Sequence, residues 1–302
     1  TQTGVANATV TMNAASMENS GFEFSATYRN HDHPFKYDIS ANLSTLRNRV
    51  TSLGFGTESY ITGAYATYVG KEIGKFYGWV YEGIARTQSD IDNHATQQGA
   101  NVGDCLYKDI SGPNGEPDGV IDAYDQTVLG SGLAKMNFGL SAHMEYKGFD
   151  LSISTYGALN YHVADDIYNS LNSCYGWGNK DVAMADANRF SEDGSTYLSN
   201  VPRTYVDNKG TLAWNDLFSS RKIQNAAYWK IANVELGYNF PDRWFKGLVT
   251  GVRAYVSAQN LYTFTGYKGY NVDYAGGTFT PGYNFCSFPS ARSFMAGLHF
   301  TF

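Results

Sequence analysis

The sequence has few charged residues and no long hydrophobic run. Only 17% of its 302 residues are charged, whereas soluble domains usually carry roughly 25%. No stretch of about 18 consecutive apolar residues occurs, which excludes a transmembrane helix. The formal net charge of −6 offers no basic stripe to a phosphate backbone, so we do not expect a nucleic-acid partner.

Motifs of catalysis and of metal or redox chemistry are also missing. There is no G-x-S-x-G, no H-E-x-x-H and no plausible triad, and the acidic pair Asp165-Asp166 has no identifiable partner. We therefore expect no enzyme. Cys105, Cys174 and Cys286 are far apart and form no C-x-x-C pair, which argues against a zinc or redox motif. At most one disulfide can form among them, and three isolated side chains are the alternative.

Aromatic residues and glycine are abundant. Tyr (24), Phe (18) and Trp (5) make up 16% of the chain and there are 32 glycines, a composition that favours strands and turns. The mean hydropathy of −0.36 is typical of a soluble protein. A membrane-spanning β-barrel also has a low mean, however, because its strands alternate lipid-facing and lumen-facing residues.

Alternation of apolar and polar residues is the dominant pattern and extends over lengths that cross a membrane. In residues 136–147, Phe138, Leu140 and Met144 fall on one face and Ser141 and His143 on the other. After Lys147-Gly148 the alternation resumes from Phe149 to Tyr161. This predicts a long hairpin with a tight turn.

Seven further segments bring the predicted count to about nine strands. They are residues 21–29, 37–44, 60–70, 74–86, 232–240, 251–259 and 294–302, of which 60–70 and 74–86 are interrupted by glycine. Lys230 is the exception on an otherwise apolar face that includes Tyr228 and Phe240, and we expect its long side chain to snorkel at the outer end. Tyr28, Tyr146, Tyr161, Tyr228 and Trp244 are expected in interfacial girdles.

The predicted connections alternate in length. Short turns at 31–34, 70–73, 147–148 and 241–247 alternate with long loops at 87–134, 164–223 and 266–290, as periplasmic turns alternate with outer loops in outer-membrane barrels. A soluble β-sandwich is the alternative, but its strands average about 5 to 6 residues. Nine strands leave two open edges that lipid does not tolerate, so an N-terminal piece must pair with both. The start Thr1-Gln2-Thr3 shows neither an initiator Met nor a signal peptide, which indicates a mature piece or fragment.

Several stretches resemble the C-terminal half of the SusC/RagA family of TonB-dependent outer-membrane transporters. Their order and spacing cover nearly the whole chain. They are Asn19-Ser20-Gly21-Phe22-Glu23, residues 73–80 (IGKFYGWV), Gly119-Val120-Ile121-Asp122 with Asp125, residues 146–152 (YKGFDLS), Leu236-Gly237-Tyr238 and residues 256–265 (VSAQNLYTFT).

The resemblance implies an all-β, transmembrane antiparallel barrel of about 22 strands with long extracellular loops, of which residues 1–302 are the C-terminal part. It implies a location in the bacterial outer membrane, among membrane lipids and lipopolysaccharide, and active import of oligosaccharides or peptides. A SusD-like surface lipoprotein would cover the mouth. The plug domain and the contact with TonB-ExbB-ExbD belong to the family's N-terminal half, so we expect neither in this chain. An outer-membrane receptor or adhesin and a soluble carbohydrate-binding β-domain are the alternative functions.

One loop carries a possible calcium motif. Oxygen donors occur at the spacing of an EF-hand loop, with Gly119 at position 6. The candidate ligands are Asn114, Glu116, Asp118, the carbonyl of Val120, Asp122 and Asp125. Asn at the first position and Asp at the twelfth depart from the motif, Asp109 is an alternative first ligand, and an acidic solvated turn is the other interpretation. Apart from this possible Ca²⁺ we expect no cofactor.

Three further sets of residues are candidates for function. Phe294, Phe300 and Phe302 alternate to the end of the chain and resemble the signal that outer-membrane assembly machinery reads on a last strand. His143, Glu145, Arg253 and Gln259 are candidates to line the solute path, although most lumen residues only solvate a wall. Tyr175, Trp177, Tyr270, Tyr274 and Tyr283 could stack on sugar rings, pack against the lid protein or order the loops.

Overall fold

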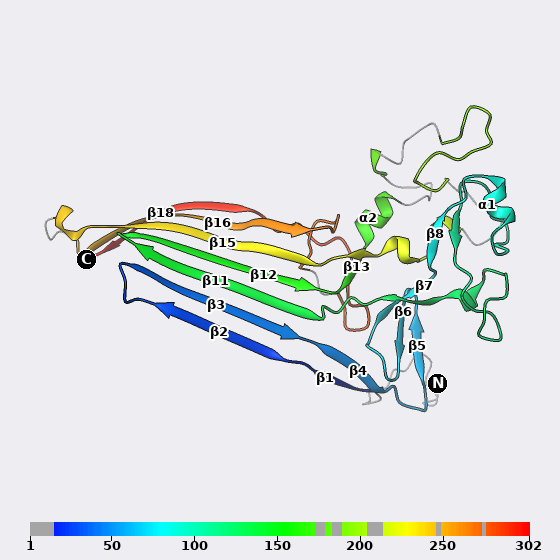
Figure 1. Ribbon diagram of the computed structural model, residues 1–302, viewed down its shortest axis with the longest axis horizontal. Helices are drawn as coiled ribbons and strands as arrows, with labels where there is room; N and C mark the ends of the chain where they lie inside the picture. The colour runs from blue at the N-terminus through cyan, green and yellow to red at the C-terminus, as the bar shows by residue number, and fades with distance from the viewer. Residues whose placement is uncertain (1–14, 173–178, 183–188, 204–213, 246–248, 274–275) are drawn as a thin grey trace, which may run out of the picture.

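A computed structural model shows a long, curved sheet that leads at one end into a folded region of loops and short strands (Figure 1). The structure describes residues 15–172, 179–182, 189–203, 214–245, 249–273 and 276–302. None of the helices in these ranges is both long enough and apolar enough to cross a membrane.

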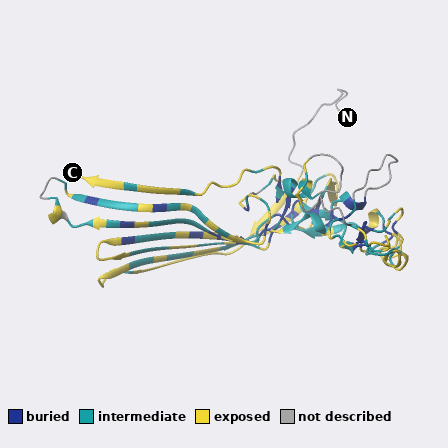
Figure 2. Cartoon of the chain, turned by 90° about the horizontal axis from the view of Figure 1, so that it is seen from above, coloured by how far each residue is buried: buried dark blue, intermediate teal, exposed yellow. Residues whose placement is uncertain are grey.

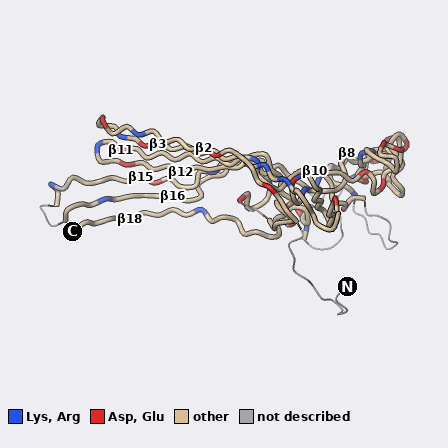
Figure 3. The backbone as a smooth tube through the Cα atoms, turned by 90° about the horizontal axis from the view of Figure 1, so that it is seen from below, with Lys and Arg blue, Asp and Glu red and all other residues tan. Residues whose placement is uncertain are grey.

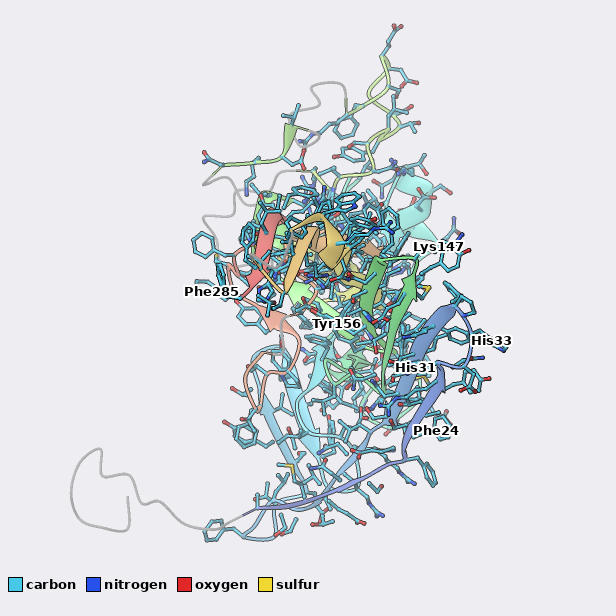
Figure 4. All side chains as sticks on the ribbon, turned by 90° about the vertical axis from the view of Figure 1, so that its left-hand side faces the viewer. Phe24, His31, His33, Lys147, Tyr156 and Phe285 are labelled. Atoms are coloured by element: carbon cyan, nitrogen blue, oxygen red, sulfur yellow. The ribbon has the colours of Figure 1, made fainter. Side chains whose placement is uncertain are left out.

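Seven strands form the sheet, and each is antiparallel to the next along the chain. The order is β18-β16-β15-β12-β11-β3-β2. The strands are β2 (Glu23–Asn30), β3 (Phe35–Thr45), β11 (Met136–Tyr146), β12 (Phe149–Leu159), β15 (Tyr228–Phe240), β16 (Gly251–Thr265) and β18 (Ser293–Thr301). Viewed along the strands, the sheet is an arc with Tyr156 on its concave side (Figure 4).

The cross-strand register keeps apolar residues on the convex face. Leu236 pairs with Leu151 on one side and with Val256 on the other, and Val256 pairs with Ala296. Large apolar side chains on this face, such as Phe24, Leu140, Leu236 and Leu298, are exposed, and most of each strand is exposed or half-buried (Figure 2). An apolar face of this size, on which no described residue outside the sheet packs, is suited to lipid.

The ends of the strands differ as the sequence predicts. Turns at one end are short, and the tightest is Lys147-Gly148, where both residues have positive φ (48° and 86°) and join Tyr146 to its partner Phe149. Positive φ at both central positions is typical of a two-residue hairpin turn. The three long connections, residues 46–135, 160–227 and 266–292, lie at the other end. Charged residues concentrate there and are sparse along the strands (Figure 3).

The predicted wall strands 60–70 and 74–86 are wrong. These residues form short strands of the loop region: β5 (Ser59–Thr62), β6 (Tyr65–Tyr68), β7 (Lys75–Gly78) and β8 (Tyr81–Ile84). The first three join β10 (Thr127–Gly130) in a small sheet. Gly63, Gly70 and Gly74 all have positive φ, which turns the chain before a long strand can form. The wall sheet therefore has seven strands in the described part of the chain, and the turn at 70–73 lies among the loops.

The loop region holds the buried cores. Phe76, Tyr107 and Val163 are fully buried there, in three separate clusters. Cys105 is buried in one of them, Cys286 is exposed, and Cys174 lies outside the described residues. The remaining elements are β1 (Ser16–Ser20), β4 (Arg47–Ser52), α1 (Gln88–Asp92), β9 (Cys105–Tyr107), η1 (Ala123–Asp125), β13 (His162–Asp165), α2 (Asp166–Leu171), η3 (Trp214–Asp216), η4 (Ser220–Lys222), β14 (Gln224–Asn225), η5 (Asp242–Trp244) and β17 (Tyr283–Asn284).

A bulge in β15 reverses the predicted orientation of Lys230. Ser154 pairs with Asn233 but Thr155 pairs with Ile231, so Ala232 is an extra residue relative to β12. Beyond the bulge the alternation is reversed, which places Lys230 opposite Tyr156 on the concave face and Trp229 on the convex face. The expectation that Lys230 snorkels on the lipid-facing side is wrong. Tyr161 is also buried, in a loop core, and not in a girdle.

Candidate functional site

An ion-pair network crosses three strands on the concave face. The Arg253 guanidinium on β16 binds both oxygens of Asp150 on β12, with 3.0 Å from Nε to Oδ1 and 2.5 Å from Nη2 to Oδ2. Nη2 also donates to Glu235 on β15, 2.7 Å away, and the Asn239 amide donates to Asp150. The fork geometry of arginine suits a carboxylate on each side. Arg253 thus links the inner sides of three neighbouring strands.

Gly237 makes room for this network. A Cβ at position 237 would lie 2.4 Å from the Arg253 Nη2 and 2.6 Å from an Asp150 oxygen. Any larger residue would displace the guanidinium that passes over it. Leu236-Gly237-Tyr238 is one of the stretches that carry the family resemblance, and the structure gives its central glycine a physical reason.

The other predicted lumen residues lie on the same face. His143 contacts Ser152 through Nδ1 at 2.8 Å and Glu145 through Nε2 at 3.2 Å. Gln259 is at a register position opposite Asn233 and Ser293. The structure therefore places all four predicted residues on the concave face, and it brings His143 and Glu145 into contact. Their role in a solute path stays a prediction.

Nearer the loops, a second polar cluster fixes the long connection after β16 to the wall. Lys230 is only 4% exposed, and its Nζ lies 2.7 Å from Oδ2 of Asp273. The Tyr156 hydroxyl donates to the same oxygen. The sequence alone does not predict this cluster. No spacing pattern pairs residue 230 with residue 273, and the extra residue Ala232 reverses the face on which Lys230 is expected.

The same connection is held at a second point. The Tyr267 hydroxyl donates to the buried Asp165 carboxylate, and the Asn284 amide donates to both groups. The Tyr161 hydroxyl donates to the Val272 carbonyl at 2.7 Å. Burial is the main cause that raises the pKa of Tyr267, and the hydrogen bond to Asp165 raises it further. Asp165, which suggested no partner from the sequence alone, is a structural anchor for two loops.

The predicted calcium loop forms a hydrogen-bonded turn. Asp125 is buried, and its two oxygens accept from the backbone N–H groups of Ile110, Ser111 and Asp122. The carboxylates of Asp109, Asp118 and Asp122 each accept from a backbone N–H as well, whereas Asn114 and Glu116 are exposed. Within the described ranges no three His, Cys, Asp or Glu side chains converge on a metal position. Calcium binding stays a prediction, and in this conformation Asp125 organises the loop.

The remaining candidate residues are distributed over the loops and the last strand. Tyr270 is 61% exposed, whereas the Tyr283 hydroxyl donates to Asp166 at 3.2 Å and its ring stacks on Phe285. Tyr175, Trp177 and Tyr274 lie outside the described residues. Phe294 and Phe300 are exposed on the convex face of β18, and Phe302 follows its end. Nothing in this geometry tests the assembly signal.

Comparison with known proteins finds TonB-dependent receptors among the relatives, although no family model matches the chain. TonB-dependent receptor P3 of Formosa agariphila is 29% identical over 310 residues, covering 96% of this chain and 29% of that protein. TonB-dependent receptor SusC of Bacteroides thetaiotaomicron is 27% identical over 311 residues, covering 98% of this chain and 27% of that protein. The chain thus spans less than a third of the length of these relatives.

Solved structures of RagAB share the fold of this chain. The RagAB peptide transporter superposes with a TM-score of 0.74 at 21% identity, covering 96% of this chain and 29% of the other. The RagAB peptide importer in its "open-open" state gives a TM-score of 0.71 at 21% identity, covering 95% and 29%. The predicted all-β fold and the predicted resemblance to the SusC/RagA family are confirmed: the relatives that match along the chain are TonB-dependent receptors and transporters of the outer membrane, and they are not enzymes.

Proposed function

We propose that this chain forms part of the barrel wall and outer loops of a TonB-dependent importer that takes up oligosaccharides or peptides. The observation that carries the proposal is the arc of seven strands, with an unpartnered apolar convex face and a polar concave face crossed by the Arg253 network. A wall of this kind separates lipid from an aqueous lumen. The relatives are named as TonB-dependent receptors and as a peptide transporter, which supports import as the activity.

The partners follow from the same proposal. Both edge strands of the arc, β2 and β18, have a free side within the described residues, and an N-terminal part of the same barrel would pair with them. A SusD-like lipoprotein would cover the outer loops, and TonB-ExbB-ExbD would act through the N-terminal part. Membrane lipids would cover the convex face, with lipopolysaccharide in the outer leaflet of the membrane.

Uptake by a strain that lacks the complete gene tests the proposal. Growth would be measured on panels of oligosaccharides and of peptides as sole carbon or nitrogen source, with the wild-type gene returned in trans as the control. We expect loss of growth on one solute class and recovery on complementation, and loss of the same growth when tonB is inactivated. Unchanged uptake of every solute in the deletion strain would contradict the proposal.

A further inference from the structure

A pocket with two positively charged side chains and no carboxylate lies where the wall passes into the loops. It encloses about 440 Å³ and is lined by Tyr168, Arg221, Gln224, Asn225, Ala227, Gly266 and Lys268. Ala227 directly precedes β15 and Gly266 directly follows β16, so the pocket is at the outer ends of these two strands. Its volume lies within the range of small-molecule sites, roughly 300 to 1,000 Å³.

The two positive charges in this pocket have no acidic partner among the residues that the structure describes. Within the described residues neither Arg221 nor Lys268 forms an ion pair, whereas the nearby Lys222 and Lys230 are paired with Asp216 and Asp273 at 2.9 and 2.7 Å. Lys268 is instead held with its Nζ 5.9 Å from the centre of the Tyr168 ring. Two cations that line one pocket and form no ion pair within the described residues give this partly enclosed space a positive potential.

Both amide side chains of the pocket have their acceptor ends occupied. The Gln224 Oε1 accepts from the Lys268 backbone N–H at 3.0 Å, and the Asn225 Oδ1 accepts from the Ala227 N–H at 2.9 Å. These bonds fix the orientation of each amide and leave its NH₂ group, the positive end of the dipole, for the pocket. The Gln224 Nε2 is buried and has no hydrogen-bond partner within the described structure. In each of these two amides, the end that these bonds do not hold is therefore a donor.

We propose that this pocket binds a carboxylate carried by the imported solute, either a uronic acid of an oligosaccharide or the C-terminal carboxylate of a peptide. The inference rests on the proposed function for the source of the ligand, but the site itself is defined by its charges and donors. Arg221 and Lys268 supply charge-assisted hydrogen bonds, and the two amides add oriented dipoles. The location at the outer ends of the wall strands suits a site that holds the solute before it enters the lumen.

Binding to the purified, full-length transporter in detergent tests the site. The probes are trigalacturonate against neutral galactotriose, and trialanine with a free C-terminus against trialanine amide. We expect the acid of one pair to bind at least tenfold more tightly than its neutral match. The pair that discriminates identifies the source of the carboxylate. Equal affinity within both pairs, or no binding of either acid, would overturn the proposal.

Two charge-removing variants and one matched control complete the experiment. Arg221→Gln and Lys268→Gln should each weaken binding of the acid roughly tenfold to a hundredfold and leave the neutral probe unchanged. Lys108→Gln removes an exposed lysine of the loop region that does not line the pocket, and it should leave both affinities unchanged. Equal losses of affinity in all three variants would show that the overall positive potential of the loops attracts the acid, and would overturn the proposal. Heat-modifiable migration checks that each variant is assembled.

Failure of this site and failure of the proposed function give different results. Binding in detergent requires no energy from TonB, so an intact charge-dependent affinity with no uptake in cells would contradict import alone. Uptake that depends on the gene, together with an affinity indifferent to Arg221 and Lys268, would contradict the site alone.

Discussion

Two arginines of the wall show how strongly the surroundings of a residue affect the strength of its ion pairs. Arg253 is 26% exposed and binds two carboxylates, one of them only 7% exposed. Arg29 on β2 is 72% exposed and lies 3.7 Å from Asp38. Both are cations paired across neighbouring strands, but water competes strongly for only one of them. They therefore make a matched pair for measuring what the network on the concave face contributes.

We predict that Arg253→Met costs about 1 to 3 kcal/mol of stability, the range for leaving a buried polar group without its hydrogen-bond partner. The reason is that Asp150 is left nearly buried with only Asn239 as a donor. Arg29→Met should cost less than about 1 kcal/mol. The temperature midpoint of heat-modifiable migration measures both. Equal midpoints for the two variants would refute a structural role for the network.

The Lys230–Asp273 pair makes a second prediction. Lys230→Met should free the loop after β16, since Asp273 would lose its only charged partner within the described residues and retain the neutral hydroxyls of Tyr156 and Tyr228. We expect a loss of up to about 3 kcal/mol, the low end for breaking a buried pair. Limited proteolysis should then cleave within residues 266–290 faster than in the wild type. Adding Asp273→Asn removes the unpaired charge and should restore at least part of the protection. Equal resistance of this loop to the protease in all three proteins would contradict an anchoring role of the Lys230–Asp273 pair.

Among the elements, β15 depends most on its bulge. With a regular alternation Trp229 would face the lumen, whereas the bulge at Ala232 turns it outward, 42% exposed and stacked on Phe264 at 5.3 Å. With the neighbouring Tyr262, these rings form an aromatic patch at the outer end of the wall, as interfacial girdles require.

Fluorescence quenching by brominated lipids tests the orientation of Trp229. In bilayers that contain the full-length protein, Trp229→Phe should remove a clear share of the quenching, because Trp229 contacts lipid. Trp214→Phe is the control, since that ring is buried in a loop core and its loss should leave lipid quenching intact. If Trp229→Phe changes nothing, the bulge assignment fails.

The bulge also shows what the sequence could and could not predict. Alternation located all seven wall strands, because a face covered by lipid and a face covered by water impose a period of two. It failed at residues 60–70 and 74–86, where positive-φ glycines divide similar residues into short strands. It also failed at Lys230, because a single inserted residue reverses every side chain beyond it without changing the composition.

The candidate site was predictable to a similar degree. Strand parity alone indicated that His143, Glu145, Arg253 and Gln259 share one face. The pairing of Arg253 with Asp150, which are 103 positions apart, depends on the order of the strands, which no local pattern encodes. The same holds for Arg221 and Lys268, which come together from two different loops.

The protein is stabilised in two ways, by strand pairing in the wall and by packed cores in the loop region. The wall has no packed core of its own within the described residues, and its strands are held by cross-strand pairing and by whatever covers the convex face. The loop region is packed around Phe76, Tyr107 and Val163 like a small soluble domain. Lys230 ties the connection after β16 to the wall, and Asp165 ties two long connections to each other.

The two faces of this sheet should differ in what they contact, with lipid at the convex face and water at the concave face. Spin labels at single cysteines along β16 of the full-length protein in bilayers, with the native cysteines replaced, test it most directly. Labels at Ala254, Val256 and Ala258 should be accessible to oxygen dissolved in lipid, and labels at Tyr255 and Gln259 to a water-soluble nickel complex. Equal access of the nickel complex to both sets would show that the two faces are not divided between lipid and water.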